Sequence, residues 1–161
     1  MNLPPASNET TPRASLIEAD EFLQLIQATI PMARDFDFAF EALSFGRVCL
    51  RLRTGAEHTR AGGTLSGPTL MTLADTALYA AVLSTVGLEA MAVTSHLHFD
   101  FLRKPSTGEL VAEARILKVG GRLVVGRVEL YSGVDRAVDH ARPVALCTGG
   151  YALPRPVAPR Q

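Results

Sequence analysis

A single charged residue, Asp75, lies inside a long apolar segment. Residues 69–88 read TLMTLADTALYAAVLSTVGL, and Asp75 is the only charged residue among them. A segment that is apolar on nearly all sides is typical of a helix buried in a globular core. An unpaired carboxylate is costly to bury, so it usually has a raised pKa, a hydrogen-bonding partner or a catalytic role. Asp75 is therefore the first candidate functional residue.

The same segment has the length of a membrane span, which is a second interpretation. Asp75 near its start, four threonines and Ser84 weaken that interpretation, and the sequence holds no second segment of this kind. The first 14 residues also lack the positive start and the apolar core of a secretory signal. We therefore expect a buried helix in a cytoplasmic protein without a membrane partner.

The charge of the chain indicates no polyanionic partner. The sequence has 16 basic and 16 acidic residues, so net charge favours neither nucleic acid nor an acidic surface. The cluster Arg47, Arg51 and Arg53 is more typical of a solvated strand face than of a binding patch. Cys49 and Cys147 lie in apolar segments without a CxxC spacing, as buried thiols of a reducing compartment do.

The length of 161 residues fits one domain. We expect this domain over residues 15–153, with a disordered lead-in over 1–14 and a disordered tail over 154–161. Ser15 and Glu18 fit a capping box at the start of a first helix, and Pro31 marks its end. Gly120 and Gly121 form a strong hairpin signal. The expected elements are helices over residues 16–30 and 68–87, a loop over 54–68, and strands over 38–43, 47–53, 93–102, 110–119, 122–131 and 144–153.

One antiparallel sheet of these strands must bury its apolar face, and only the central helix is long and apolar enough to cover it. A curved sheet wrapped around a single long helix follows, which is an α+β fold. Met71, Tyr79 and Val82 lie beside the helix stripe that faces the sheet. They give the helix a second apolar surface, which predicts a second subunit in a homodimer or homotetramer.

A loop of small residues, GGTLSGP, precedes the central helix. Gly67 lies at the helix N-terminus, where its backbone N–H and the helix dipole could stabilise an oxyanion. Alternatively, loop geometry alone explains the glycine. Ser66 fits an ordinary N-cap better than a catalytic role, and SGP is not the GxSxG of a serine nucleophile. Such a loop, a helix N-terminus and a carboxylate about two turns later would suit acyl transfer.

The stretches GTLSGPTLMTLADTA and TSHLHFDFLRKPSTGELVAEARILKVGGRLVVGRVEL resemble hotdog-fold acyl-CoA thioesterases of the phenylacetate-pathway (PaaI-like) type. The likeness covers about residues 36–153. The shared motifs are a Gly-containing loop, the Asp of LAD at Asp75, a strand that ends in FLR and a Gly-Gly-Arg hairpin. Such proteins usually carry His-Gly-Gly at the helix start, where this chain has Ser66-Gly67-Pro68. They often carry Asn a turn earlier, where this chain has Arg60.

This resemblance implies a hotdog fold and hydrolysis of an acyl- or aryl-CoA thioester without a cofactor. Asp75 would be the general base or nucleophile, and Gly67 of the neighbouring subunit would donate to the oxyanion. Thr94 stands where Ser or Thr often occurs and could hold the attacking water, although a strand Thr is usually an ordinary strand residue. Near the hairpin and after FLR, charged residues could neutralise coenzyme A phosphates or simply be solvated. The residues assigned to substrate binding are Arg60, Ser66, Arg103, Lys104, Gly121 and Arg122.

Other interpretations stay open at this point. A non-catalytic acyl-CoA-binding hotdog protein would explain the missing His-Gly-Gly, but Asp75 argues against it. A dehydratase of the same fold would need a catalytic His near the helix start, and Ser66 does not supply one. His96, His98 and Asp100 share a predicted strand face with Thr94 and could ligate a metal. A polar sheet face explains them more simply, so we expect no metal.

Overall fold

The computed structural model describes residues 13–134 and 137–154. The predicted lead-in and the predicted tail fall almost wholly outside these ranges. The described elements, in chain order, are α1 (Ala19–Thr29), the 3-10 helix η1 (Pro31–Asp35), β1 (Asp37–Ser44), β2 (Arg47–Arg53), the 3-10 helix η2 (Ala56–His58), β3 (Thr59–Arg60), β4 (Thr64–Leu65), α2 (Gly67–Val86), β5 (Val93–Phe101), β6 (Glu109–Val119), β7 (Leu123–Val134), β8 (Ala137–Val138) and β9 (Ala145–Ala152).

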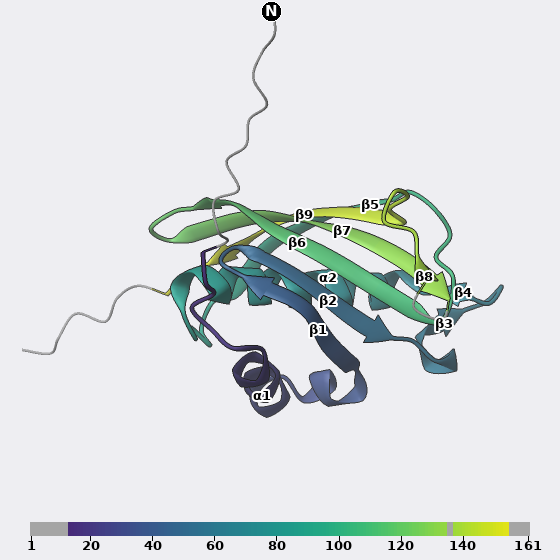
Figure 1. The fold of residues 1–161 in the computed structure, drawn as a ribbon, viewed down its shortest axis with the longest axis horizontal. Helices are drawn as coiled ribbons and strands as arrows, with labels where there is room; N and C mark the ends of the chain where they lie inside the picture. Colours follow the sequence, from purple (N-terminus) through teal and green to yellow (C-terminus); the bar gives the residue numbers. More distant parts are fainter. Residues whose placement is uncertain (1–12, 135–136, 155–161) are drawn as a thin grey trace, which may run out of the picture.

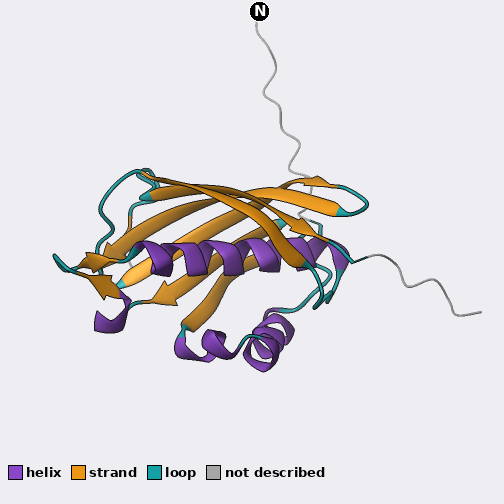
Figure 2. Cartoon of the chain, turned by 180° about the vertical axis from the view of Figure 1, so that it is seen from behind, coloured by secondary structure: helices purple, strands orange, loops and turns teal. Residues whose placement is uncertain are grey.

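A curved antiparallel sheet wraps around the long helix α2 (Figures 1 and 2). Its strand order is β1-β2-β6-β7-β9-β5, and the short β8 pairs with β7. The sheet therefore has β1 at one edge and β5 at the other, and residues of α2 form the centre of the core beneath it. The predicted α+β architecture is confirmed.

The middle of α2 approaches the sheet closely over two glycines. Gly126 of β7 and Gly149 of β9 are paired across the strands. A Cβ atom on either glycine would lie within 3 Å of the Leu78 side chain, at 2.6 Å for Gly126 and 2.9 Å for Gly149. Glycine is needed at both positions so that α2 can pack this close to the sheet. α2 has the length and apolar composition of a membrane span, yet 72% of its most apolar stretch is buried in this fold.

The ends of α2 match the sequence prediction. Ser66 is the N-cap, and its Oγ accepts a hydrogen bond from the Thr69 backbone N–H at 3.4 Å. Gly87 follows the helix with a φ of +90°, a conformation that glycine adopts without strain. The start of the helix, and with it the loop that could bind substrate, is therefore fixed by ordinary capping.

The first helix begins later than predicted. Ser15 does not cap it, because the Ser15 hydroxyl bonds to the backbone of Ile17 instead. Glu18 is the N-cap, and its backbone N–H donates to the Glu21 carboxylate at 3.1 Å. The helix then ends before Pro31, as predicted, and η1 continues from it. Together α1 and η1 lie below α2 and next to β1 (Figure 1).

The segment over residues 54–68, predicted to be a loop, contains η2 and a small β3–β4 hairpin. His58, for which the sequence suggested no partner, is buried there. Its Nδ1 accepts a hydrogen bond from the Gly55 N–H at 2.9 Å. Its carbonyl oxygen accepts bonds from the Ser66 N–H at 2.9 Å and from the Thr69 hydroxyl at 3.1 Å. His58 thus anchors the residues that begin α2.

Candidate functional site

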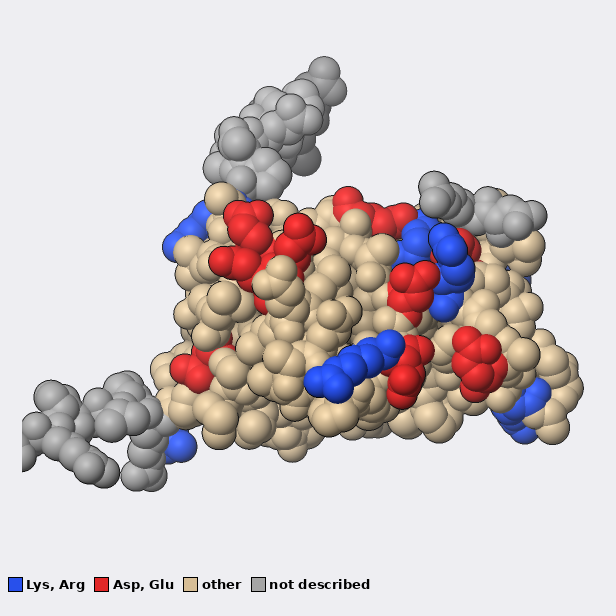
Figure 3. Space-filling model, turned by 90° about the horizontal axis from the view of Figure 1, so that it is seen from below, with Lys and Arg blue, Asp and Glu red and all other residues tan. Residues whose placement is uncertain are grey.

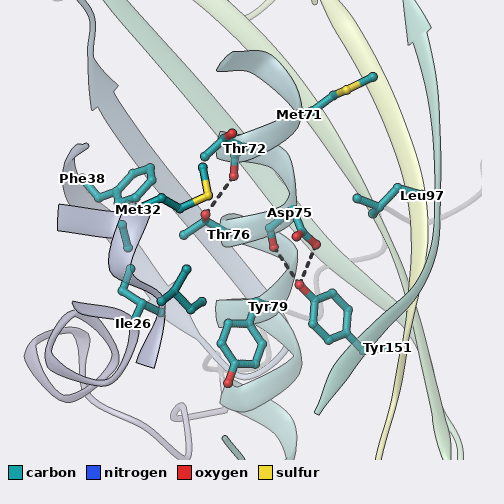
Figure 4. Close-up of a pocket in the computed structure, with 12 residues that line it drawn as sticks. Ile26, Met32, Phe38, Met71, Thr72, Asp75, Thr76, Tyr79, Leu97 and Tyr151 are labelled. Carbon is teal, nitrogen blue, oxygen red and sulfur yellow. Dashed lines mark hydrogen bonds between the residues drawn. The ribbon is translucent and has the colours of Figure 1, made fainter. Parts of the chain in front are cut away.

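The carboxylate of Asp75 accepts hydrogen bonds from two hydroxyl groups on β9 and β5, the two strands at one edge of the sheet. The Tyr151 hydroxyl on β9 donates to Asp75 Oδ1 at 2.6 Å, and the Thr94 hydroxyl on β5 donates to the same oxygen at 3.0 Å. Figure 4 shows Asp75 and Tyr151 pointing toward each other from α2 and β9. Within the described ranges, no hydrogen bond reaches Asp75 Oδ2. The half-buried carboxylate therefore keeps one oxygen for another partner.

A β-bulge turns Thr94 toward Asp75. Thr94 pairs with Tyr151, but the next pair along β5 is His96 with Gly150, so the register shifts between Thr94 and His96. A bulge inserts one extra residue and reverses the face that the following side chains take. The strict alternation assumed from the sequence, which placed Thr94 on one face with His96 and His98, is therefore wrong at this point. Thr94 shares the inner face with Tyr151.

Tyr151 is the functional candidate that sequence reasoning missed. Its ring is buried, with 4% exposed, and stacks on the Tyr79 ring with centroids 5.4 Å apart. Burial, and next the charge of Asp75, raise the pKa of Tyr151 far above its usual range, so the phenol stays protonated and acts as a donor. The sequence signal that could have pointed to Tyr151 was the apolar strand that contains it, because every second residue of such a strand faces the core. That signal could not identify Asp75 as its partner.

An apolar cavity of about 260 Å³ opens beside Asp75. It is lined by side chains from α1, η1, α2 and the strands β1, β5 and β9, and Figure 4 shows them around the carboxylate. Among the described residues that line it, Asp75 is the only charged one. A carboxylate with one unoccupied oxygen thus borders a space that favours an apolar ligand group.

Gly67 borders a different, more open hollow of about 520 Å³. Arg60, Arg103 and Lys104 also line it, so the structure brings four of the predicted site residues together. The Gly67 N–H is one of the donors that a helix N-terminus leaves without an intrahelical partner. Within the described residues, it donates to no acceptor. The Arg103 side chain donates to the Pro143 carbonyl at 2.6 Å, which fixes its position beside the hollow.

Two groups of predicted site residues lie apart within one protomer. Gly67 and Asp75 are separated by eight residues of α2, which corresponds to about 12 Å along the helix axis. Gly121 and Arg122 lie in the β6–β7 hairpin, near Val119 and Leu123. Arg103 and Lys104 follow the opposite end of the sheet, because β5 ends beside the start of β9. Within the chain, the predicted site residues therefore lie in separate places.

Charged side chains on the surface form small mixed groups rather than one extended patch. Seen from below, acidic and basic side chains are interspersed, and this face carries no extended basic area (Figure 3). His98 Nε2 lies 3.7 Å from Asp100 Oδ2, and both side chains are well exposed. Over residues 13–134 and 137–154, no cluster of three or more His, Cys, Asp or Glu side chains is placed to hold a metal ion.

Known proteins resemble this chain over most of its length. The sequence profile of the thioesterase superfamily matches residues 62–139. A candidate thioesterase from a Silicibacter species is 35% identical, with a TM-score of 0.74 over 89% of this chain and 96% of that chain. A variant of the phenylacetic acid degradation protein PaaI from Thermus thermophilus is 25% identical, with a TM-score of 0.65 over 77% of this chain and 99% of that one. A candidate esterase from Halobacterium salinarum is 29% identical over 84% of this chain and 95% of its own. These matches confirm the predicted hotdog fold.

Proposed function

The chain belongs to the thioesterase superfamily, and on this basis we propose that it hydrolyses acyl- or aryl-CoA thioesters with Asp75 as the catalytic carboxylate. The observation that carries the proposal is the setting of Asp75. Tyr151 and Thr94 fix one carboxylate oxygen, the other accepts no hydrogen bond from the described residues, and Asp75 lines the apolar cavity. A positioned carboxylate beside an apolar binding space is the arrangement that general-base or nucleophilic hydrolysis requires.

In the general-base form, Asp75 Oδ2 takes a proton from water while the water oxygen attacks the thioester carbonyl carbon. The tetrahedral oxyanion then collapses, the carbon–sulfur bond breaks, and the proton passes to the leaving thiolate. The products are a carboxylic acid and free coenzyme A. The Gly67 N–H would stabilise the oxyanion, with support from the helix dipole. In the nucleophilic form, Asp75 attacks the carbonyl carbon first, and the carbon–sulfur bond breaks to release coenzyme A thiolate. Water then cleaves the resulting mixed anhydride, which frees the carboxylic acid and restores the Asp75 carboxylate.

The geometry of β5 supports a site formed between two subunits. β5 is an edge strand, and most of its residues are exposed. Thr94 near its start contacts Asp75, and Phe101 at its end lies 3.6 Å from the position that a Gly67 Cβ would occupy. Two copies of β5 (Val93–Phe101) paired antiparallel about their midpoint would place Val93 opposite Phe101, and Thr94 opposite Asp100, of the partner subunit. Asp75 would then face the partner's Gly67.

The same pairing would unite the basic residues. Val93, Ala152 and Leu123 lie in one row across β5, β9 and β7, so Leu123 is about 10 Å from Val93 at ~4.8 Å per strand. The antiparallel dimer would bring Arg122 of one subunit to the end of β5 that precedes the partner's Arg103. Coenzyme A phosphates would be held between these residues.

The test of the reaction is release of free coenzyme A from a panel of acyl- and aryl-CoAs, followed with a thiol reagent. We expect enzyme-dependent release with several substrates. The alternative, a non-catalytic acyl-CoA-binding protein, predicts saturable binding by calorimetry without release. Binding without turnover across the whole panel would overturn the proposal in favour of that alternative.

The subunit arrangement can be tested with mixed oligomers. Gly67→Pro removes only the proposed N–H donor at a helix position where proline is tolerated, and Gly67→Ala, which keeps the N–H, is the matched control. Each of Asp75→Asn and Gly67→Pro should be nearly inactive alone. After the two are unfolded and refolded together, activity should return, because mixed dimers contain one intact site. No recovery, or a monomer by light scattering, would contradict a shared site.

A further inference from the structure

We infer that the cavity beside Asp75 is an acyl-binding pocket whose far wall is built by α1 and η1, and that this wall restricts the substrate to short and medium acyl groups. The inference rests on the proposed function, because it names the acyl class that the same site would accept. The wall residues lie between positions 26 and 38, outside the region that the superfamily profile matches.

Asp75 divides the cavity into two sides (Figure 4). One side lies toward the edge strand β5, where Leu97 and Met71 border the cavity. The other side is closed by apolar side chains of α1, η1 and β1, and Figure 4 shows Met32 there near Thr76. A thioester carbonyl at Asp75 would leave its coenzyme A on the β5 side. Its acyl chain would then extend toward the α1–η1 wall, which is formed by Ile26, Ile30, Met32, Ala33 and Phe38.

Among the described residues that line the cavity, no side-chain hydroxyl is without an acceptor of its own. The Thr72 and Thr76 hydroxyls line the cavity, but each donates to a carbonyl one turn back in α2, at 2.9 Å and 2.8 Å. The Tyr151 hydroxyl donates to Asp75 at 2.6 Å and the Tyr79 hydroxyl to the Ala90 carbonyl at 3.5 Å. Apart from these groups and Asp75, the lining is alkyl and aromatic. Such a surface selects for an apolar acyl chain or ring.

The inner part of the far wall is fixed and limits the depth of the pocket, whereas Ile30 and Met32 at its rim are exposed. Ile26 is 1% exposed and Ala33 is 6% exposed, so both belong to the core. The Arg34 guanidinium donates through Nε to the Gln27 carbonyl at 2.8 Å, which ties η1 back to α1. A wall anchored by core packing stops a chain that is too long instead of moving aside.

The cavity volume sets the size of the group. Its 260 Å³ would hold about nine groups of the size of a water molecule, at ~30 Å³ each. The thioester itself occupies part of this space. The remainder suits an acyl group of about six to eight carbons, straight or with one aromatic ring, by the same ~30 Å³ per group.

The experiment measures kcat/KM for straight-chain acyl-CoAs from acetyl-CoA to palmitoyl-CoA. Each added methylene should raise kcat/KM about fourfold while the pocket fills, as expected for burial of one CH₂ group. The values should peak near hexanoyl- and octanoyl-CoA and fall at least tenfold for the longest chains. Binding of the same series to Asp75→Asn, followed by calorimetry, should show the same optimum.

Two substitutions on the wall should move the optimum in opposite directions. Ala33→Leu fills the pocket and should shift it to chains about three carbons shorter, and Met32→Ala, at a side chain that is 53% exposed, should shift it to longer chains. Ala28→Leu makes the same change as Ala33→Leu on an exposed position of α1 outside the pocket, and should leave the optimum unchanged.

The outcomes separate the two proposals. Turnover with a flat chain-length profile, or a profile that Met32→Ala and a folded Ala33→Leu both leave unmoved, would overturn the wall assignment and leave the hydrolase proposal standing. Absence of turnover would refute the hydrolase proposal. The binding series would then test the pocket assignment, which holds if the chain length that binds best shifts in the two wall variants and fails if it does not. If Ala33→Leu does not fold, Met32→Ala alone decides between a shifted and an unshifted optimum.

Discussion

Replacing Asp75 with Asn would separate the charge of this side chain from its shape. The amide oxygen of Asn can occupy the position of Asp75 Oδ1 and accept the same two hydrogen bonds from Tyr151 and Thr94, now 2.6 Å and 3.0 Å long. The second position then holds an NH₂ group, which can neither take a proton from water nor attack a thioester. Asp75→Asn should therefore lower kcat by about two orders of magnitude or more, as loss of a positioned general base does.

The same substitution should change stability little. A hydrogen bond to a charged group contributes about 1.5–3 kcal/mol and one to a neutral group about 0.5–1.5 kcal/mol, so weakening two bonds costs roughly 2 kcal/mol. Removing a half-buried charge from a largely apolar site offsets a cost of similar size. The free energy of unfolding should then stay within about 1–2 kcal/mol of the unsubstituted protein, measured by urea denaturation.

Tyr151→Phe is the matched control, because it removes only the hydroxyl, which bonds to Asp75 Oδ1 at 2.6 Å and to the Asp75 carbonyl oxygen at 3.2 Å, and retains the ring that stacks on Tyr79. It should cost about 1.5–3 kcal/mol of stability, the usual contribution of a bond to a charged group. It should also lower kcat by about tenfold through a less well oriented carboxylate, which is a loss of about 1.4 kcal/mol in transition-state stabilisation. Since this effect acts through Asp75, the double variant should be no slower than Asp75→Asn alone.

The reasoning would be refuted by either of two results. Near-normal turnover of Asp75→Asn would remove the carboxylate from the reaction. Multiplicative losses in the double variant would mean that Tyr151 acts on the substrate or on folding instead of on Asp75. Thermal unfolding of all three variants identifies the folding case, because a misfolded protein would lose both its transition and its activity.

Three further predictions follow from the same geometry. Arg122→Ala, or Arg103→Ala together with Lys104→Ala, should raise KM for acyl-CoA several-fold but not for a short thioester without the nucleotide, since each exposed contact contributes about 1 kcal/mol or less. The KM of these variants should also depend less on salt, and equal losses on both substrates would end the phosphate assignment. Burial first of all, and nearby carboxylates next, raise the pKa of Cys49 and Cys147 to about 12. Both thiols should therefore react slowly with a thiol reagent at pH 7, and their reaction rate should rise about tenfold per pH unit up to that pKa. Rapid labelling of the native protein at pH 7 would contradict this.

The sequence was sufficient for the fold because its signals are local. A helix that is apolar on all sides, strands that alternate, and the Gly120-Gly121 turn each determine their own element, and together they leave one way to cover the sheet. The start of α1 was harder to predict from the sequence, because both Ser15 and Glu18 can cap a helix. The competition was decided by the Ser15 hydroxyl, which satisfies the backbone of Ile17 instead.

The candidate site could be predicted from the sequence only in part, because some of its residues lie far apart along the chain. Asp75 is a charge in an apolar segment, so one residue and its neighbours identify it. Tyr151 lies 76 residues further along the chain and meets Asp75 only because the sheet curves around α2. The bulge that turns Thr94 inward depends on pairing with β9, and no turn residue in β5 announces it. Partners that meet across a sheet leave no periodic signal in either segment.

The unusual apolarity of α2 connects its fold with its proposed chemistry. The sheet covers one side of the helix, and α1 with η1 covers a second side, where the cavity lies. The remaining side, toward edge strand β5, exposes 40% of Met71 and leaves Leu97 only half buried. An apolar side next to an open strand edge favours a second subunit. That subunit would exclude water from the space beside Asp75 and strengthen the interaction of the carboxylate and of the Gly67 N–H with a charged transition state. The feature that makes the helix recognisable in the sequence thus also favours the proposed second subunit that would complete the site.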